Sequence, residues 1–110
     1  MTKDEKDHKS KLARLGCMVC RRLYDINHGE VELHHRRKGM GWGKGDYTTL
    51  IPLCPEHHRG NSGVHGLGTK RFEKEYGFTE EDLLNDALSL IDSLPYTWYF
   101  ISLITLRHAQ

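Results

Sequence analysis

The chain has 110 residues, 37% hydrophobic and 28% charged, so it is long enough for one compact domain and too short for two. Its longest apolar-leaning run covers residues 96–106, far below the ~20 residues that span a bilayer. Residues 1–16 lack the apolar stretch of a signal peptide. These features argue against a membrane or exported protein, and we expect a cytoplasmic one.

The net charge of +1 conceals two halves of opposite sign. Residues 1–71 carry 14 Lys and Arg against 8 Asp and Glu, whereas residues 72–110 carry 2 against 7. A basic half suits contact with a polyanion, and an acidic half suits a surface that faces away from it. Ordinary surface charge on both halves would give the same counts.

The N-terminal residues are polar and highly charged, so we expect a flexible segment over residues 1–16, with at most a helical turn at residues 11–16. Residues 31–35 alternate apolar and polar side chains, which predicts a strand. Residues 47–53 favour a second strand. The four glycines in residues 38–46 predict a flexible loop between the two strands, which we expect to pair antiparallel.

Helices are expected after the second strand. Pro55 suits the first position of a short helix, which Gly60 should end. A second helix should cover residues 69–76, with Thr69 as its N-cap. A third should begin at Thr79, because three acidic residues and then an apolar stripe follow it. Strands and helices together predict a small α+β fold.

All three cysteines belong to two short pairs. Cys17 and Cys20 are separated by two residues, and so are Cys54 and His57. Because zinc favours four thiolate or imidazole ligands and a two-residue spacer lets both members of a pair reach one ion, this pattern predicts a structural Zn²⁺ site. Free or buried thiols and a redox-active pair are the alternatives, but the βαβ context of redox motifs is missing.

Five of the eight histidines lie within a short part of the chain, namely His34, His35, His57, His58 and His65. Consecutive side chains of a strand point to opposite faces, so His34 and His35 cannot bind the same ion from a regular strand. His57 and His58 diverge by about a quarter turn at a helix start, so each can serve a different site. We therefore expect a second, histidine-rich site beside the zinc site.

Basic residues flank this second site. A metal ion, a base and phosphate-binding cations together point to phosphodiester hydrolysis. The expected phosphate contacts are Arg36, Arg37, Lys38, Lys44 and Arg59. Trp42, in the glycine-rich loop, either stacks on DNA bases or packs onto the domain.

Several short motifs follow one another along the chain in a recognisable order. They are Cys17-x2-Cys20, Glu32-Leu-His-His-Arg36, Gly39-Met-Gly-Trp-Gly43, Ile51-Pro-Leu-Cys-Pro-Glu-His-His-Arg59, Gly63-Val-His65 and Phe72-Glu-Lys-Glu-Tyr-Gly77. This order resembles HNH endonucleases of the His-Me finger type. More narrowly, residues 17–77 are similar to the phage Ref family, recombination-enhancement proteins described as RecA-dependent nucleases.

The resemblance implies a zinc-knuckle ββα-metal core with additional C-terminal helices. Residues 17–110 would form a single HNH nuclease domain, with its core at residues 17–77 and a helical extension at residues 78–110. The chain would then be a metal-dependent DNA endonuclease of a phage or its bacterial host. Its partners would be single-stranded DNA or recombination intermediates, together with a RecA filament.

The resemblance also implies individual roles. His34 and His58 match ligands of the catalytic ion, and His35 matches the general base that activates water. The third ligand often lies one helical turn after the second, where this chain has Ser62, so we assign His65 instead. Thr49 stands where HNH enzymes have the asparagine that orients the base, and threonine forms fewer hydrogen bonds. The catalytic ion would be Mg²⁺ or Mn²⁺, although histidine ligands also favour Zn²⁺ or Ni²⁺.

Other functions fit parts of the pattern. A non-catalytic zinc module that binds DNA or protein would need the zinc ligands alone, without the additional histidines. An accessory protein of recombination would act through a recombinase, with the acidic helix over residues 79–94 as its docking face. A toxin nuclease is also possible, but the chain shows no delivery segment.

Overall fold

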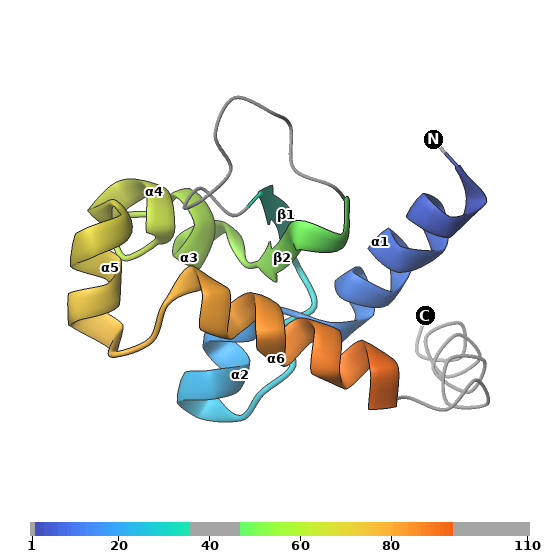
Figure 1. Ribbon diagram of the computed structural model, residues 1–110. Helices are drawn as coiled ribbons and strands as arrows, with labels where there is room; N and C mark the ends of the chain where they lie inside the picture. The colour runs from blue at the N-terminus through green and yellow to red at the C-terminus, as the bar shows by residue number, and fades with distance from the viewer. Residues whose placement is uncertain (1, 36–46, 94–110) are drawn as a thin grey trace.

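The computed structural model describes residues 2–35 and 47–93. The elements are α1 (Lys3–Leu15), α2 (Met18–Tyr24), β1 (Glu32–His35), the 3-10 turn η1 (Tyr47–Thr49), β2 (Leu50–Leu53), α3 (Pro55–Arg59), α4 (Val64–Leu67), α5 (Thr69–Tyr76) and α6 (Glu80–Ser93). Figure 1 shows the two strands in the middle, α1 on one side of them, the α3–α5 group on the other, and α6 crossing below. The fold is therefore small and α+β, as expected.

The two strands form one antiparallel sheet, as the sequence predicts. His34 pairs with Ile51, and His35 pairs with Leu50. Because neighbouring side chains alternate between faces, His34 is buried and His35 is exposed. The second strand is shorter than expected, because residues 47–49 form a 3-10 turn. Its four residues pair with the four residues of β1. The glycine-rich loop predicted between the strands lies outside the described residues.

Helix α1 differs from the flexible segment that the sequence predicted over residues 1–16. The Thr2 hydroxyl caps it by accepting a hydrogen bond from the Glu5 amide at 3.1 Å. Leu12 and Leu15 share one face of the helix and are both buried in the core, where α1 contacts the hairpin and α6. Tertiary burial of these two leucines offsets the cost of ordering an otherwise polar segment.

Two short helices were not expected from the sequence. Helix α2 follows Cys17, whose Sγ accepts a hydrogen bond from the Cys20 amide at 3.4 Å, so the two cysteines lie at the start of a helix. Helix α4 is a single turn after Gly63. Within the described parts of the chain, none of the helices is long and apolar enough to cross a membrane.

A reciprocal pair of hydrogen bonds begins α6. The Thr79 hydroxyl accepts from the Asp82 amide at 3.0 Å, and the Asp82 carboxylate accepts from the Thr79 amide at 2.9 Å. Helix α5 lacks such a cap: its N-cap is Gly68, so the prediction that Thr69 is the N-cap was wrong. One side of α6 is buried through Leu83, Leu84 and Ala87.

Thr79→Ala should lower the free energy of unfolding by about 1 kcal/mol, because the Asp82 amide loses its acceptor. Thr69→Ala is the control and should change it by less than about 0.5 kcal/mol.

The Thr79 amide also lowers the pKa of Asp82, so the stabilisation by this carboxylate is present at neutral pH and is lost as the pH falls through that lowered pKa. Urea denaturation followed by circular dichroism measures both effects, and equal results for the two variants would contradict the capping role.

Candidate metal centres

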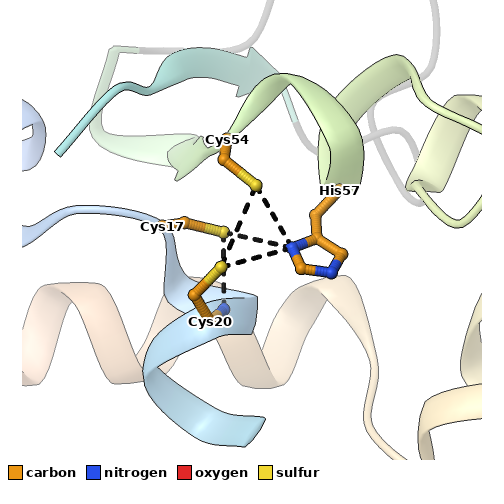
Figure 2. A group of neighbouring side chains, drawn as sticks. All are labelled: Cys17, Cys20, Cys54 and His57. Atoms are coloured by element: carbon orange, nitrogen blue, oxygen red, sulfur yellow. Dashed lines mark hydrogen bonds between the residues drawn. The ribbon is translucent and has the colours of Figure 1, made fainter. Parts of the chain in front are cut away.

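The two pairs of predicted zinc ligands meet in the interior. Cys17 and Cys20 come from the start of α2, and Cys54 and His57 come from the junction of β2 and α3 (Figure 2). All four are buried, and His57 has the largest exposed fraction, 8%. The hairpin and α2 are separate in sequence, so one shared ion would join the two halves of the core.

The spacing of the four donor atoms fits a tetrahedral ion. His57 Nδ1 lies 3.7, 3.5 and 3.2 Å from the Sγ atoms of Cys17, Cys20 and Cys54, and the Cys20 and Cys54 sulfurs are 3.9 Å apart. Ligands at 2.1–2.3 Å from one zinc ion lie about 3.4–3.8 Å from each other. These distances match ligands around a common ion better than they match hydrogen bonds between thiols.

The electrostatics of this cluster also fit a cation. Burial and the neighbouring thiols raise the pKa of the Cys20 thiol to about 12, and burial raises the pKa of the Cys54 thiol. Thiolates without a cation are therefore strongly disfavoured here. Burial lowers the pKa of His57, which favours the neutral imidazole that binds metals. The cluster can hold zinc.

The second group of histidines also converges. The ligand atoms of His34, His58 and His65 all lie within 4.8 Å of one another. His58 Nε2 and His65 Nε2 are 3.2 Å apart, and the His34 ring centroid lies 5.1 Å from each of the other two rings. His34 is buried, His58 half-buried and His65 exposed, so this group extends from the interior to the surface.

Two carboxylates contact these imidazoles. Glu80 at the start of α6 lies 2.5 Å from His34 Nε2, and Glu32 on β1 lies 2.8 Å from His58 Nδ1. Glu32 also accepts hydrogen bonds from Arg59 at 2.9–3.0 Å, and these bonds, with His58, hold the pKa of Glu32 below its usual range. Arg59, predicted to contact phosphate, is therefore ion-paired, although its side chain remains 66% exposed.

Close packing of α4 against α3 places His65 beside His58. A Cβ atom on Gly63 would collide with the backbone of Glu56 and His57, and one on Gly66 would collide with the Gly60 carbonyl. Only glycine permits this approach at the two positions. The contact brings the single turn of α4, and with it His65, within reach of α3.

The Ser62 side chain contacts Glu56 instead of joining the three histidines. Its hydroxyl and its amide both donate to the Glu56 carboxylate, at 2.5 and 3.1 Å, and these bonds lower the pKa of Glu56. The Ser62 carbonyl accepts a hydrogen bond from the Tyr76 hydroxyl at 2.6 Å. Ser62 thus fixes the connection between α3 and α4, and the histidine-rich group draws its third member from α4.

Two of the remaining predicted site residues, His35 and Thr49, lie in the described part of the chain. His35 is exposed at the end of β1, and Thr49 directly precedes Leu50, the residue paired with His35. The other predicted DNA contacts lie outside the described residues; they are Arg36, Arg37, Lys38, Trp42 and Lys44.

A family model described as "Recombination enhancement, RecA-dependent nuclease" matches residues 1–92 of the chain. The chain belongs to this family, abbreviated Ref. The Ref match contains both clusters and almost all of α6, whereas the similarity seen in the sequence covered residues 17–77. A family of RecA-dependent nucleases acting in recombination enhancement implies DNA as the substrate. No curated protein matches the chain.

Sequence reasoning about this Ref protein missed the two carboxylate partners. Glu32 carried a signal, because a strand places residues 32 and 34 on the same face, beside the histidine site. Glu80 carried none: it was interpreted only as an acidic residue suited to a helix N-terminus. Its contact with His34 joins residues 46 positions apart and depends on how α6 packs against the hairpin.

Proposed function

We propose that this Ref protein is an HNH-type endonuclease that hydrolyses DNA phosphodiester bonds with one catalytic ion. The observation that supports this proposal best is the convergence of His34, His58 and His65 next to an independent Cys₃His cluster. A binding module stabilised by zinc needs the cysteine cluster alone. A second, partly exposed group of three imidazoles can hold the ion for metal-assisted hydrolysis where substrate can reach it.

Two of the three imidazoles contact a carboxylate through one nitrogen and can offer the other nitrogen to a shared ion. His34 uses Nε2 for Glu80 and His58 uses Nδ1 for Glu32, which leaves His34 Nδ1 and His58 Nε2 as donors. His65 Nε2 lies beside His58 Nε2 and completes the set. Mg²⁺ or Mn²⁺ bound here would stabilise negative charge on the phosphate and on the leaving 3′ oxygen, and Zn²⁺ or Ni²⁺ also suits these ligands.

His35 is the general base in this proposal. It lies next to a proposed metal ligand on β1 and is exposed, so a water molecule and a DNA strand can reach it. As a neutral imidazole it would accept the proton of the attacking water. Thr49 would orient the base from the neighbouring strand, and Arg59 would contact the DNA backbone from α3. We extend the same role to the basic residues and Trp42 in residues 36–46.

The domain division follows from the same proposal. Residues 17–77 would form the zinc-knuckle ββα-metal core, with β1 and β2 as its strands and α3 as its helix. Residues 78–110 would be an extension of this single nuclease domain. The RecA filament would present the DNA.

Cleavage of single-stranded, nicked and duplex DNA, with Mg²⁺ or Mn²⁺ and with or without RecA filaments, tests the proposal. We expect the wild type to cut, with RecA stimulating the reaction. His65→Ala should reduce cleavage by at least the ~10–100-fold that loss of a ligand's hydrogen-bond partner typically costs, because it removes the ligand itself. Ser62→Ala, the matched control, keeps the backbone hydrogen bonds of residue 62 with Glu56 and Tyr76 and should cut like the wild type.

Two results would contradict the proposal. No cleavage by a folded, zinc-loaded wild type under any of these conditions would favour the non-catalytic binding module. Loss of cleavage in Ser62→Ala with full activity in His65→Ala would move the third ligand to Ser62.

A further inference from the structure

The Glu80 carboxylate is buried although it stands at the start of a helix. Its side chain is 2% exposed, as is that of His34, whose Nε2 lies 2.5 Å from Glu80 Oε1. A carboxylate placed only to favour the positive end of a helix has no need of burial, and Glu81 next to it is exposed. Because burying a charged group is costly, a buried carboxylate indicates a specific partner, which here is His34.

The contact determines which nitrogen of His34 carries a proton. A carboxylate accepts a hydrogen bond from Nε2–H, so Nδ1 is the nitrogen of His34 that keeps a lone pair for an ion shared with His58 and His65, whose ligand atoms lie within 4.8 Å. We infer that Glu80 is a positioning residue that holds His34 in the tautomer and orientation needed to bind the catalytic ion. This inference rests on the proposed metal site and adds α6 to it.

Glu80 is itself held rigidly. The reciprocal bonds between Thr79 and Asp82 fix the first turn of α6 on either side of it. Leu83 and Leu84 anchor the next turn in the core, and α6 contacts β2. The orientation of a ligand on β1 thus depends on a helix outside the ββα unit.

The other carboxylate is less well suited to this role. Glu32 divides its oxygens between His58 and Arg59, and its side chain is 32% exposed, so solvent weakens its hold on the imidazole. The Glu80–His34 pair is buried on both sides. A charge-assisted hydrogen bond that is shielded from water is the stronger constraint.

Glu80→Gln tests the inference because it keeps the size of the side chain and one acceptor oxygen but removes the charge. Glu81→Gln, the same change at the neighbouring exposed residue, is the matched control. Ni²⁺ binding to the zinc-loaded protein, measured by isothermal titration calorimetry, should be about 10–100-fold weaker in Glu80→Gln and unchanged in Glu81→Gln. Glu80→Leu, which offers no acceptor, should bind Ni²⁺ more weakly still.

Cleavage provides a second readout. In Glu80→Gln, the Mn²⁺ concentration for half-maximal cleavage should rise, while saturating Mn²⁺ should restore the rate and the KM for DNA should stay the same. A purely structural defect would not be rescued by Mn²⁺. Thermal unfolding checks that each variant is folded.

The outcomes separate the inference from the proposed function. Wild-type Ni²⁺ affinity in Glu80→Gln, together with lost binding in His34→Ala, would overturn the role of Glu80 and leave the metal site standing. Equal losses in Glu80→Gln and Glu81→Gln would also overturn it. If neither the wild type nor His34→Ala bound Ni²⁺ beyond the structural zinc site, the proposed metal site would fail as well.

Discussion

Replacing His35 with alanine should abolish DNA cleavage and leave folding, zinc binding and DNA binding unchanged. The side chain is exposed at the end of β1, so its removal leaves no cavity in the core. Its neighbour His34 points to the opposite, buried face and keeps its contact with Glu80. The expected loss is about 10²–10⁴-fold, the contribution of a positioned general base.

The measurement compares cleavage rates at saturating Mn²⁺ for the wild type and His35→Ala. His28→Ala is the matched control, because His28 is also an exposed histidine but lies in the connection between α2 and β1, outside both clusters. It should cut at the wild-type rate. If His35→Ala cuts as fast as His28→Ala, the general base must be another group, and the proposed mechanism is wrong.

The two clusters could be anticipated because short-range geometry determines much of each. Two residues between paired ligands let Cys17 and Cys20 approach one ion in any compact fold. Strand alternation likewise separates His34 from His35 before any tertiary contact is known. The structure brings the members of each set together, with His65 rather than Ser62 beside His58.

What the sequence did not predict depends on tertiary packing. Helix α1 is stabilised by burial of Leu12 and Leu15 against the rest of the core, and two apolar residues in a charged segment give little periodic signal. The Glu80–His34 contact arises only when α6 packs across the hairpin. Neither feature can be inferred from local residue spacing.

The fold brings residues of the two oppositely charged halves of the sequence into contact. Arg22, from the basic half, donates to Asp86 on α6 at 2.7 Å. Among the described residues, the acidic helix α6 therefore contacts the basic helix α2, so the two halves meet at this ion pair. This contact also engages part of the acidic side of α6 that a recombinase-docking role would use.

The two adjacent histidines of α3 should respond to substitution in opposite ways. His57→Ala should lose cooperative folding, because it removes a proposed zinc ligand from the buried Cys₃His cluster. His58→Ala should remain folded and lose cleavage, because it removes a proposed ligand of the catalytic ion. Chelation of the structural zinc should reproduce the effect of His57→Ala.

The size of the expected effect follows from comparing two energies. Structural zinc contributes about 10–16 kcal/mol of binding free energy in zinc-finger peptides, whereas whole domains are stable by about 5–15 kcal/mol. Losing the ion from a cluster that joins α2 to the hairpin should therefore remove most of the stability of the fold. Thermal unfolding followed by circular dichroism measures this loss for each variant and for the chelated wild type.

Cobalt substitution identifies the cluster that is lost. Co²⁺ bound to cysteine thiolates gives a charge-transfer absorption that an all-histidine site does not give, so the band reports on the Cys₃His cluster alone. We expect His58→Ala to keep both the band and a cooperative unfolding transition, and His57→Ala to lose the transition and to show the band only at higher Co²⁺ concentrations, because three thiolates remain without the imidazole. If His57→Ala unfolded like His58→Ala and kept the same band, His57 would not be a zinc ligand, and the division of the two histidines between two sites would be wrong.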